Sequence, residues 1–285
     1  MPMEIDRKQI KQQAKEALSL SRPSFWVVTF VYLLMTTGVS TAADFSDGAL
    51  GLFLTFAVTM YSWVVGFSYR LWALWTVRRL DPGLGSLMEG FSVAGRVILL
   101  EISILGRTLG WSFLIAIPAG LLMLTMTSAV GYIAAIGLLS LAVTIITLRY
   151  SLSYYVLADF PDAGPGYALH RSVQLMKGWT MEMVKLHLSF AGWYILSFVL
   201  AIAGSIAGAL FTGGAAIFSM FTTENLTQLS AILNAGIPSL LGTLVSLPVT
   251  LYLTPYIEVT LAQFYDARIK LADTTADPMG GMPPL

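Results

Sequence analysis

Six long apolar runs decide what this chain can fold into. No Asp, Glu, Lys or Arg interrupts any of them. A helix needs about 20 mostly apolar residues to cross the hydrocarbon core of a bilayer. The backbone of such a segment must satisfy its own hydrogen bonds, so the runs predict helices. We expect an all-α integral membrane protein with spans at approximately residues 24–43, 49–69, 108–127, 129–148, 188–210 and 236–257.

The composition supports this fold class and argues against several others. Hydrophobic residues make up 56% of the 285-residue chain and charged residues 11%, whereas soluble domains carry about 25% charged residues. The 16 basic residues balance the 16 acidic ones, so no basic excess suggests a nucleic-acid partner. With two His and no Cys, we expect no metal site and no cofactor. The expected partner is the lipid bilayer, and the oligomeric state is left open.

The basic residues predict the orientation. All 16 fall in four segments, namely the N-terminal segment, 70–107, 149–187 and the C-terminal segment. The only charged residues in the connections on the other side are Asp44, Asp47 and Glu224. Basic residues concentrate on the cytoplasmic side, so we expect a multi-pass protein of a bacterial cytoplasmic membrane with both termini inside. Residues 1–270 are expected to form one membrane domain, and residues 271–285 a flexible tail. Cleavage after the first run is disfavoured, because that run exceeds a typical signal core.

Short amphipathic helices are expected before the membrane hairpins. The clearest covers residues 6–20, with Asp6 as N-cap and an apolar face built largely from Ala. This helix either lies on the inner leaflet or packs on the protein's own cytoplasmic face, which the small Ala side chains favour. A second is expected at 164–178, with Pro165 in its first turn and Gly178 ending it, and a weaker third at 85–95.

These helices suggest three repeated units, each a cytoplasmic helix followed by a membrane hairpin. Trp26, Trp111 and Trp193 lie near the starts of the three hairpins. Ser68-Tyr69 and Ser153-Tyr154 end the second helices of two hairpins. The alternative is that Trp and Tyr simply favour the membrane interface.

The segment from Leu157 to Val199 resembles a bacterial membrane-protein family called domain of unknown function 975. The signature of that family is A-D-x-P, then A-L-x-x-S-x-x-L-M-x-G, then L-S-F-x-G-W. Pro255-Tyr256 and Phe264-Tyr265 are similar to its closing P-Y and F-Y pairs. The resemblance implies a multi-spanning membrane protein with no assigned activity. The matching residues in the segment include Asp159, Pro161, Ser172, Met176, Gly178, Ser189, Gly192 and Trp193.

A few polar residues near the ends of the runs could act at a functional site. Glu258 follows Pro248 and Pro255, and it marks either an ion site or hinge or a tolerated kink. His187 could titrate near neutral pH, although an interfacial hydrogen bond is the more ordinary role. Lys177 is expected to face lipid phosphates or solvent.

Pairs of residues three or four apart predict contacts. Glu182 and Lys185 are three apart and can form an ion pair. Small residues four apart, at Gly204 and Gly208 and at Gly106 and Gly110, predict close helix contact.

Function is less well determined than architecture. No H-E-x-x-H helix, G-x-S-x-G elbow or P-loop occurs in the sequence, so we do not expect an enzyme. The favoured reading is a protein that handles a solute or lipid within its helix bundle. The alternative is a membrane-anchored scaffold that recruits a partner through its cytoplasmic helices.

Overall fold

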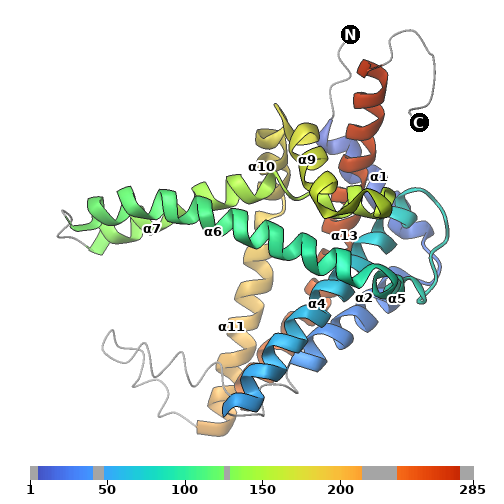
Figure 1. Cartoon of the computed structure of the whole chain (residues 1–285). Coiled ribbons are helices and arrows are strands. Elements are labelled where there is room, and N and C mark those ends of the chain that lie inside the picture. Colours follow the sequence, from blue (N-terminus) through green and yellow to red (C-terminus); the bar gives the residue numbers. More distant parts are fainter. Residues whose placement is uncertain (1–5, 41–47, 125–128, 214–235, 277–285) are drawn as a thin grey trace. The chain divides into compact units, whose positions relative to one another are not determined.

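A computed structural model describes residues 6–40, 48–124, 129–213 and 236–276, and this part of the chain is helical with no strand (Figure 1). The contacts divide the chain into two compact units. The large unit comprises residues 1–186 and 258–285, and the small unit residues 187–257. The last helix, α13 (Gly236–Ala276), contributes its first part to the small unit and its last part to the large one.

Five stretches of helix are long and apolar enough to cross a membrane. A sixth is obtained if α1 (Arg7–Leu20) is counted together with α2 (Phe25–Leu33) and η1 (Leu34–Gly38), across a bend of 91°. The chain is therefore a helical, multi-pass membrane protein. The five stretches are Gly48–Val77, Ser86–Pro118, Ala134–Asp159, Ala191–Thr212 and Gly236–Ala272.

The helices run further than the apolar runs that predict them. The run at 129–148 coincides with α7 (Ala129–Leu148). By contrast, α4 (Gly48–Val77) continues past residue 69, and α6 (Ala94–Leu124) begins well before residue 108. The helix predicted at 236–257 continues to Ala276, into the expected tail. α11 (Ala191–Gly213) begins three residues later than predicted, and residues 41–43 of the first predicted span lie outside the described residues. Charged residues end a hydropathy signal, but they do not end a helix when they have partners.

The N-terminal helix packs on the protein itself. Asp6 caps α1, because its Oδ1 accepts a hydrogen bond from the backbone N–H of Lys8 at 2.9 Å. Ile10, Ala14 and Leu18 are almost completely buried. The cap and the apolar face predicted for this helix are confirmed.

Four short helices follow α7. A turn at residues 149–152 separates α7 from α8 (Ser153–Asp159), and η3 (Pro161–Ala163) leads into α9 (Gly164–Met176). Gly178 has φ +80°, a left-handed conformation that suits glycine, and it separates α9 from α10 (Thr180–Leu188). The predicted helix break at Gly178 is confirmed. The weak third candidate at 85–95 forms a short helix, α5 (Ser86–Glu89), and a 3-10 turn, η2 (Gly90–Val93).

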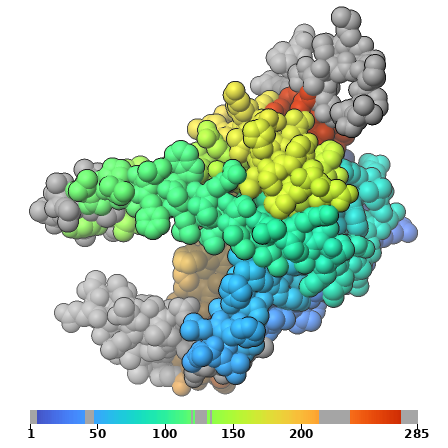
Figure 2. All heavy atoms as spheres, in the orientation of Figure 1, coloured from blue at the N-terminus to red at the C-terminus, as the bar shows by residue number. Residues whose placement is uncertain are grey.

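One part of α6 is covered by another helix of the large unit, and another part exposes apolar side chains. Figure 2 shows α9 packed against α6. Further along α6, large apolar side chains are exposed, as expected for a helix that faces lipid. They include Leu105, Leu109, Trp111, Phe113, Leu114, Ile117 and Leu121.

Glycines bring two helices close together in the small unit. A methyl group added at Gly208 of α11 would lie 2.7 Å from Cα of Pro238 in α13, and one added at Gly204 would lie 2.7 Å from the carbonyl oxygen of Leu241. The close contact predicted for these two glycines is confirmed. A methyl group at Gly106 or Gly110 would meet nothing within 4 Å, so within the described residues that prediction was wrong. Two glycines four residues apart therefore form a close contact only where a second helix lies against that face.

Candidate functional site

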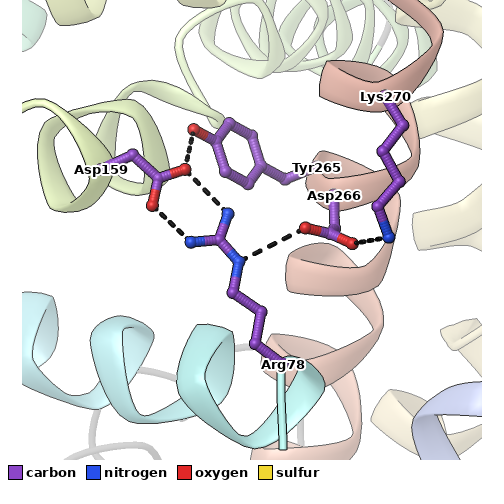
Figure 3. Close-up of polar contacts among 5 residues, drawn as sticks. All are labelled: Arg78, Asp159, Tyr265, Asp266 and Lys270. Atoms are coloured by element: carbon purple, nitrogen blue, oxygen red, sulfur yellow. Dashed lines mark hydrogen bonds and ion pairs between the residues drawn. The ribbon is translucent and has the colours of Figure 1, made fainter. Parts of the chain in front are cut away.

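Five residues from the end of α4, from α8 and from α13, all in the large unit, form the Arg78 cluster, which consists of Arg78, Asp159, Tyr265, Asp266 and Lys270 (Figure 3). The two terminal nitrogens of Arg78 donate to the two oxygens of Asp159 at 2.6 and 2.8 Å. Its Nε donates to Asp266 at 3.3 Å. The hydroxyl of Tyr265 donates to Asp159 at 2.9 Å, and Lys270 lies 2.6 Å from Asp266. The cluster therefore ties the end of α4 to α8 and to α13.

The Arg78 cluster is balanced in charge. Two cations face two carboxylates, and the guanidinium fork matches the planar carboxylate of Asp159. The side chains of Arg78 and Asp159 are 31% and 17% exposed. The hydrogen bonds to Asp159 raise the pKa of Arg78 above its usual value, and burial opposes this rise. The arrangement suits a permanent connection between helices, since every charge has its counter-charge.

A second group, the Arg70 cluster, lies eight residues earlier on both α4 and α13 (78 − 70 and 266 − 258). It consists of Arg70, Glu101, Tyr154, Tyr155 and Glu258. Nε of Arg70 lies 3.8 Å from Glu258, and the guanidinium lies 3.8 Å above the ring of Tyr154. Tyr155 donates its hydroxyl hydrogen to Glu258 at 3.1 Å, and Tyr154 interacts through its hydroxyl with Glu101 of α6. This cluster contains two carboxylates and one guanidinium.

The pairing pattern fixes the direction of the helices. The ion pair from α4 to α13 recurs after eight residues in both, which is about 12 Å along a helix. The two helices therefore run parallel in the large unit. In α8, Tyr155 and Asp159 follow in the same order. The ends of α4, α8 and α13 thus point the same way.

Buried aromatic rings occupy the space around the two clusters. Tyr69 stacks on Trp72 with ring centroids 5.2 Å apart, and Tyr155 stacks on Tyr265 at 5.4 Å. The hydroxyl of Tyr69 is 2.8 Å from Thr29 Oγ1. All of these side chains except that of Thr29 are large, and all are almost completely buried. This rigid core restrains the polar groups beside it.

The family-motif residues of the segment 159–178 have identifiable roles in the large unit. Asp159 meets Tyr265, so the A-D-x-P and F-Y motifs are brought together. Pro161 starts η3, and Ser172 is buried and donates to the carbonyl oxygen of Arg149 at 2.8 Å. Met176 is fully buried at the end of α9, whereas Lys177 and Gly178 form the exposed link that follows.

The end of α9 is capped from α13. Arg268 donates from Nε and Nη2 to the carbonyl oxygen of Leu175, at 3.1 and 2.9 Å. The last carbonyls of a helix have no partner within it, so Arg268 satisfies a group that the break at Gly178 leaves open. Its guanidinium also lies 4.6 Å above the ring of Trp179.

The remaining motif residues lie in the small unit, apart from Glu258. Phe190 packs edge-to-face on Tyr256 at 5.2 Å, and Trp193 lies 5.5 Å from Tyr252. The L-S-F-x-G-W motif thereby packs on the P-Y pair of α13. The others flank this aromatic group: half-buried His187, exposed Ser189 and Gly192, and buried Pro255.

Two arginines that complete the clusters, Arg70 and Arg78, were not identified from the sequence. They were used only as basic residues that report orientation. The available signal was the matched spacing of eight residues, with opposite charge, in two segments that follow apolar runs. The predicted pair of Glu182 and Lys185 is confirmed at 2.7 Å.

Two cavities lie beside α1 in the large unit. One of about 300 Å³ is lined by polar side chains that include Gln13, Glu16, Gln263 and Lys270. Another of about 200 Å³ is bordered by Leu20, Ser21 and Pro82. Within the described ranges, no three His, Asp or Glu residues converge in a way that could hold a metal ion.

A family comparison accounts for these shared motifs. The model of the family described as "Protein of unknown function (DUF975)" matches residues 1–271. The chain belongs to this family. Comparisons with curated proteins and with solved structures found no match. The residues that carry the DUF975 resemblance thus hold the fold together, with Asp159, Tyr265 and Tyr256 each in a specific contact.

Proposed function

We propose that this DUF975 protein is a non-enzymatic, multi-pass protein of a bacterial cytoplasmic membrane that handles a solute or lipid within its helix bundle. The observation that carries the proposal is the Arg70 cluster. Arg70, Glu101 and Glu258 each lie in a stretch that is apolar enough to cross a membrane. Ionisable residues in such segments are costly and usually serve a function.

The proposed orientation has both termini in the cytoplasm. Ion pairs join all four basic segments of the chain, which supports their lying on one side. Arg7 contacts Glu182 at 3.4 Å, and Arg96 contacts Asp162 at 3.1 Å. Arg78 bridges to Asp159 and Asp266.

We also propose that the chain consists of three related units. The parallel ends of α4, α8 and α13 support this idea, since each would lie at the end of one unit. Arg70 directly follows the pair Ser68-Tyr69, and Tyr155 directly follows the pair Ser153-Tyr154. Both contact Glu258.

Access of water to the Arg70 cluster tests the proposed function. The natural chain contains no cysteine, so a single Glu101→Cys variant has no background. A charged, membrane-impermeant thiol reagent added to each side of sealed vesicles should label it from at least one side. Val65→Cys, at a fully buried position of α4, should stay unlabelled, and Lys8→Cys should react readily. If Glu101→Cys is as unreactive as Val65→Cys, solute handling at this site is rejected.

The alternative is a scaffold that recruits a partner through its cytoplasmic helices. The polar cavity between α1 and the end of α13 favours it, since Gln13, Glu16 and Lys270 line a concave surface there. If the thiol test rejects solute handling, the next test compares the proteins that co-purify with the natural chain and with the Gln13→Arg variant, in which this surface is altered.

A further inference from the structure

Two consecutive arginines follow α4, and their surroundings differ. The guanidinium of Arg78 is bonded to Asp159 and Asp266. Arg79 is exposed, and within the described part of the chain its guanidinium forms no hydrogen bond or ion pair. Arg79 therefore carries a charge that the contacts of the fold do not use.

The backbone of Arg79 adopts a conformation that glycine usually supplies. Its φ of 56° is left-handed. The N–H of Arg79 donates to the carbonyl oxygen of Thr76 at 3.2 Å, and the next N–H, of Leu80, donates to that of Trp75 at 3.0 Å. These are the hydrogen bonds of a helix end that commonly has Gly at this position. Because a side chain is strained there, the turn itself does not explain an arginine.

Arg79 lines both cavities beside α1. The larger one, of about 300 Å³, is also lined by Glu16 and by the amide side chains of Gln13 and Gln263. Glu16 accepts a hydrogen bond from Gln12 at 3.1 Å, and no cation of the described ranges pairs with it. A guanidinium and a carboxylate thus border one cavity without bonding to each other. This pattern is complementary to a ligand with one negative and one positive group.

The chemistry of the lining groups indicates which charges the ligand carries. A guanidinium matches the oxygens of a phosphate group, and a carboxylate accepts hydrogen bonds from an ammonium group. The two glutamine amides can both donate and accept. Lys270 lines the same cavity as a second cation, although it is also paired with Asp266 at 2.6 Å. Phosphoethanolamine combines the two charges in one group.

The location favours a lipid over a soluble phosphate ester. Arg79 lies just beyond the apolar stretch Gly48–Val77, at the level where lipid headgroups begin. The helix α1 meets α2 and η1 at a bend of 91°, so α1 lies along the membrane surface when α2 crosses the membrane. The smaller cavity shares Ala17 and Arg79 with the larger one and has Leu20 and Pro82 in its wall. A polar cavity beside one with apolar walls suits an amphipathic ligand.

We propose that Arg79 and Glu16 form a headgroup site for a phospholipid that carries a primary amine, namely phosphatidylethanolamine. Its phosphate binds Arg79, and its ammonium binds Glu16. The site is separate from the Arg70 cluster and does not depend on solute handling there. It assigns to a lipid the surface that the scaffold alternative assigns to a protein partner.

The variant Arg79→Gly tests the phosphate contact without disturbing the turn, because glycine suits the left-handed conformation. The full-length protein, delipidated in detergent, is titrated with phosphatidylethanolamine, and the rise of the thermal midpoint is measured, since a ligand of the folded state raises it. Arg79→Gly should bind at least about tenfold more weakly, as expected for the loss of a hydrogen-bonded charge, and its midpoint without lipid should not fall.

Lys8→Gln is the matched control. It removes an exposed cation of α1 that lines neither cavity, so its affinity should equal that of the natural protein. Equal affinity of Arg79→Gly and the natural protein would overturn the proposal. An equal loss in Lys8→Gln would do the same, because it would show attraction by charge alone.

Two further comparisons test the identity of the ligand. The natural protein should prefer phosphatidylethanolamine to phosphatidylglycerol, which has no ammonium, and Glu16→Gln should lose this preference. A preference that survives in Glu16→Gln would refute the ammonium contact. Soluble phosphoethanolamine should leave the midpoint unchanged at concentrations at which the lipid raises it; an equal rise would reject the lipid as the ligand. None of these outcomes affects the Glu101→Cys labelling test, so the two proposals fail separately.

Discussion

Arg78 and Asp159 form a two-point ion pair between residues 81 positions apart in the chain. Asp159 is held from a third direction by the hydroxyl of Tyr265. Three of the hydrogen bonds that stabilise the large unit thus end on a single carboxylate. Its replacement is the most direct way to test how much the connection contributes.

Asp159→Asn should lower the stability of the detergent-solubilised protein. The amide of Asn carries no charge and has only one oxygen. It can therefore accept only one of the two hydrogen bonds that Arg78 donates to Asp159. Hydrogen bonds to charged groups contribute about 1.5–3 kcal/mol, so we expect a loss of about 2 kcal/mol, seen as a lower thermal midpoint. Asp162→Asn is the matched control, because Asp162 is 93% exposed in its pair with Arg96 and such pairs contribute little. Equal midpoints for the two variants would contradict the prediction.

Gly208→Ala should destabilise the small unit, whereas Gly192→Ala should not. A methyl group at Gly208 would lie 2.7 Å from Cα of Pro238, but at Gly192 it would meet nothing within 4 Å. Overpacking costs roughly 1–3 kcal/mol. A tolerated Gly→Ala change gains up to about 1 kcal/mol.

The larger change Gly208→Leu extends this comparison. It should destabilise the protein more than Leu200→Ala does, since Leu200 is only half-buried on the same helix. Thermal unfolding of the four variants provides the ranking. An unchanged midpoint for Gly208→Leu would remove the packing claim.

Glu182→Gln should have an effect that depends on pH. The hydrogen bond from Lys185 lowers the pKa of Glu182 below its ordinary value of 4.5, and Arg7 adds to this. A carboxyl whose pKa falls on folding contributes stability above its unfolded pKa and loses it as the pH falls through the folded value. The difference in midpoint between natural protein and variant should be present at neutral pH and vanish in acid. It should be small, because the side chain is 32% exposed; a difference that grows as the pH falls would refute this account.

Reporter fusions should place position 46 and the C-terminus on opposite sides of the membrane. The expectation follows from the concentration of all 16 basic residues in four segments. An alkaline phosphatase fused after residue 46 should be active, and the same enzyme fused after Leu285 should be inactive. Two active or two inactive fusions would contradict the six-span orientation.

Hydropathy predicts helices well here and their ends poorly. The run at 129–148 matches α7, and a turn at residues 149–152 follows it. The run ending at Tyr69 does not mark the end of α4, because the Arg70 side chain finds Glu258, far away in sequence. Asp6, Pro165 and Gly178 were identified correctly since capping is local.

Local sequence cannot show which charges are paired. Glu101 lies outside the apolar runs, and its partner Tyr154 lies on another helix. Arg78 contacts Asp159 and Asp266, which lie in two segments far from it in the sequence. The same limit applies to glycines four residues apart. Gly106 and Gly208 both belong to such pairs, but only Gly208 lies close to another helix.

The order of residues in the Arg78 cluster has a consequence for biosynthesis. Asp159 leaves the ribosome before Tyr265 and Asp266, which follow 106 and 107 positions later (265 − 159 and 266 − 159). At about 5–20 residues per second, that interval lasts roughly 5–20 s. During it, Arg78 and Asp159 can already pair, but the second carboxylate is missing. A nascent chain that ends before residue 265 can therefore hold Arg78 and Asp159 as a neutral pair that joins α4 to α8 before the last part of α13, with Tyr265 and Asp266, has been made.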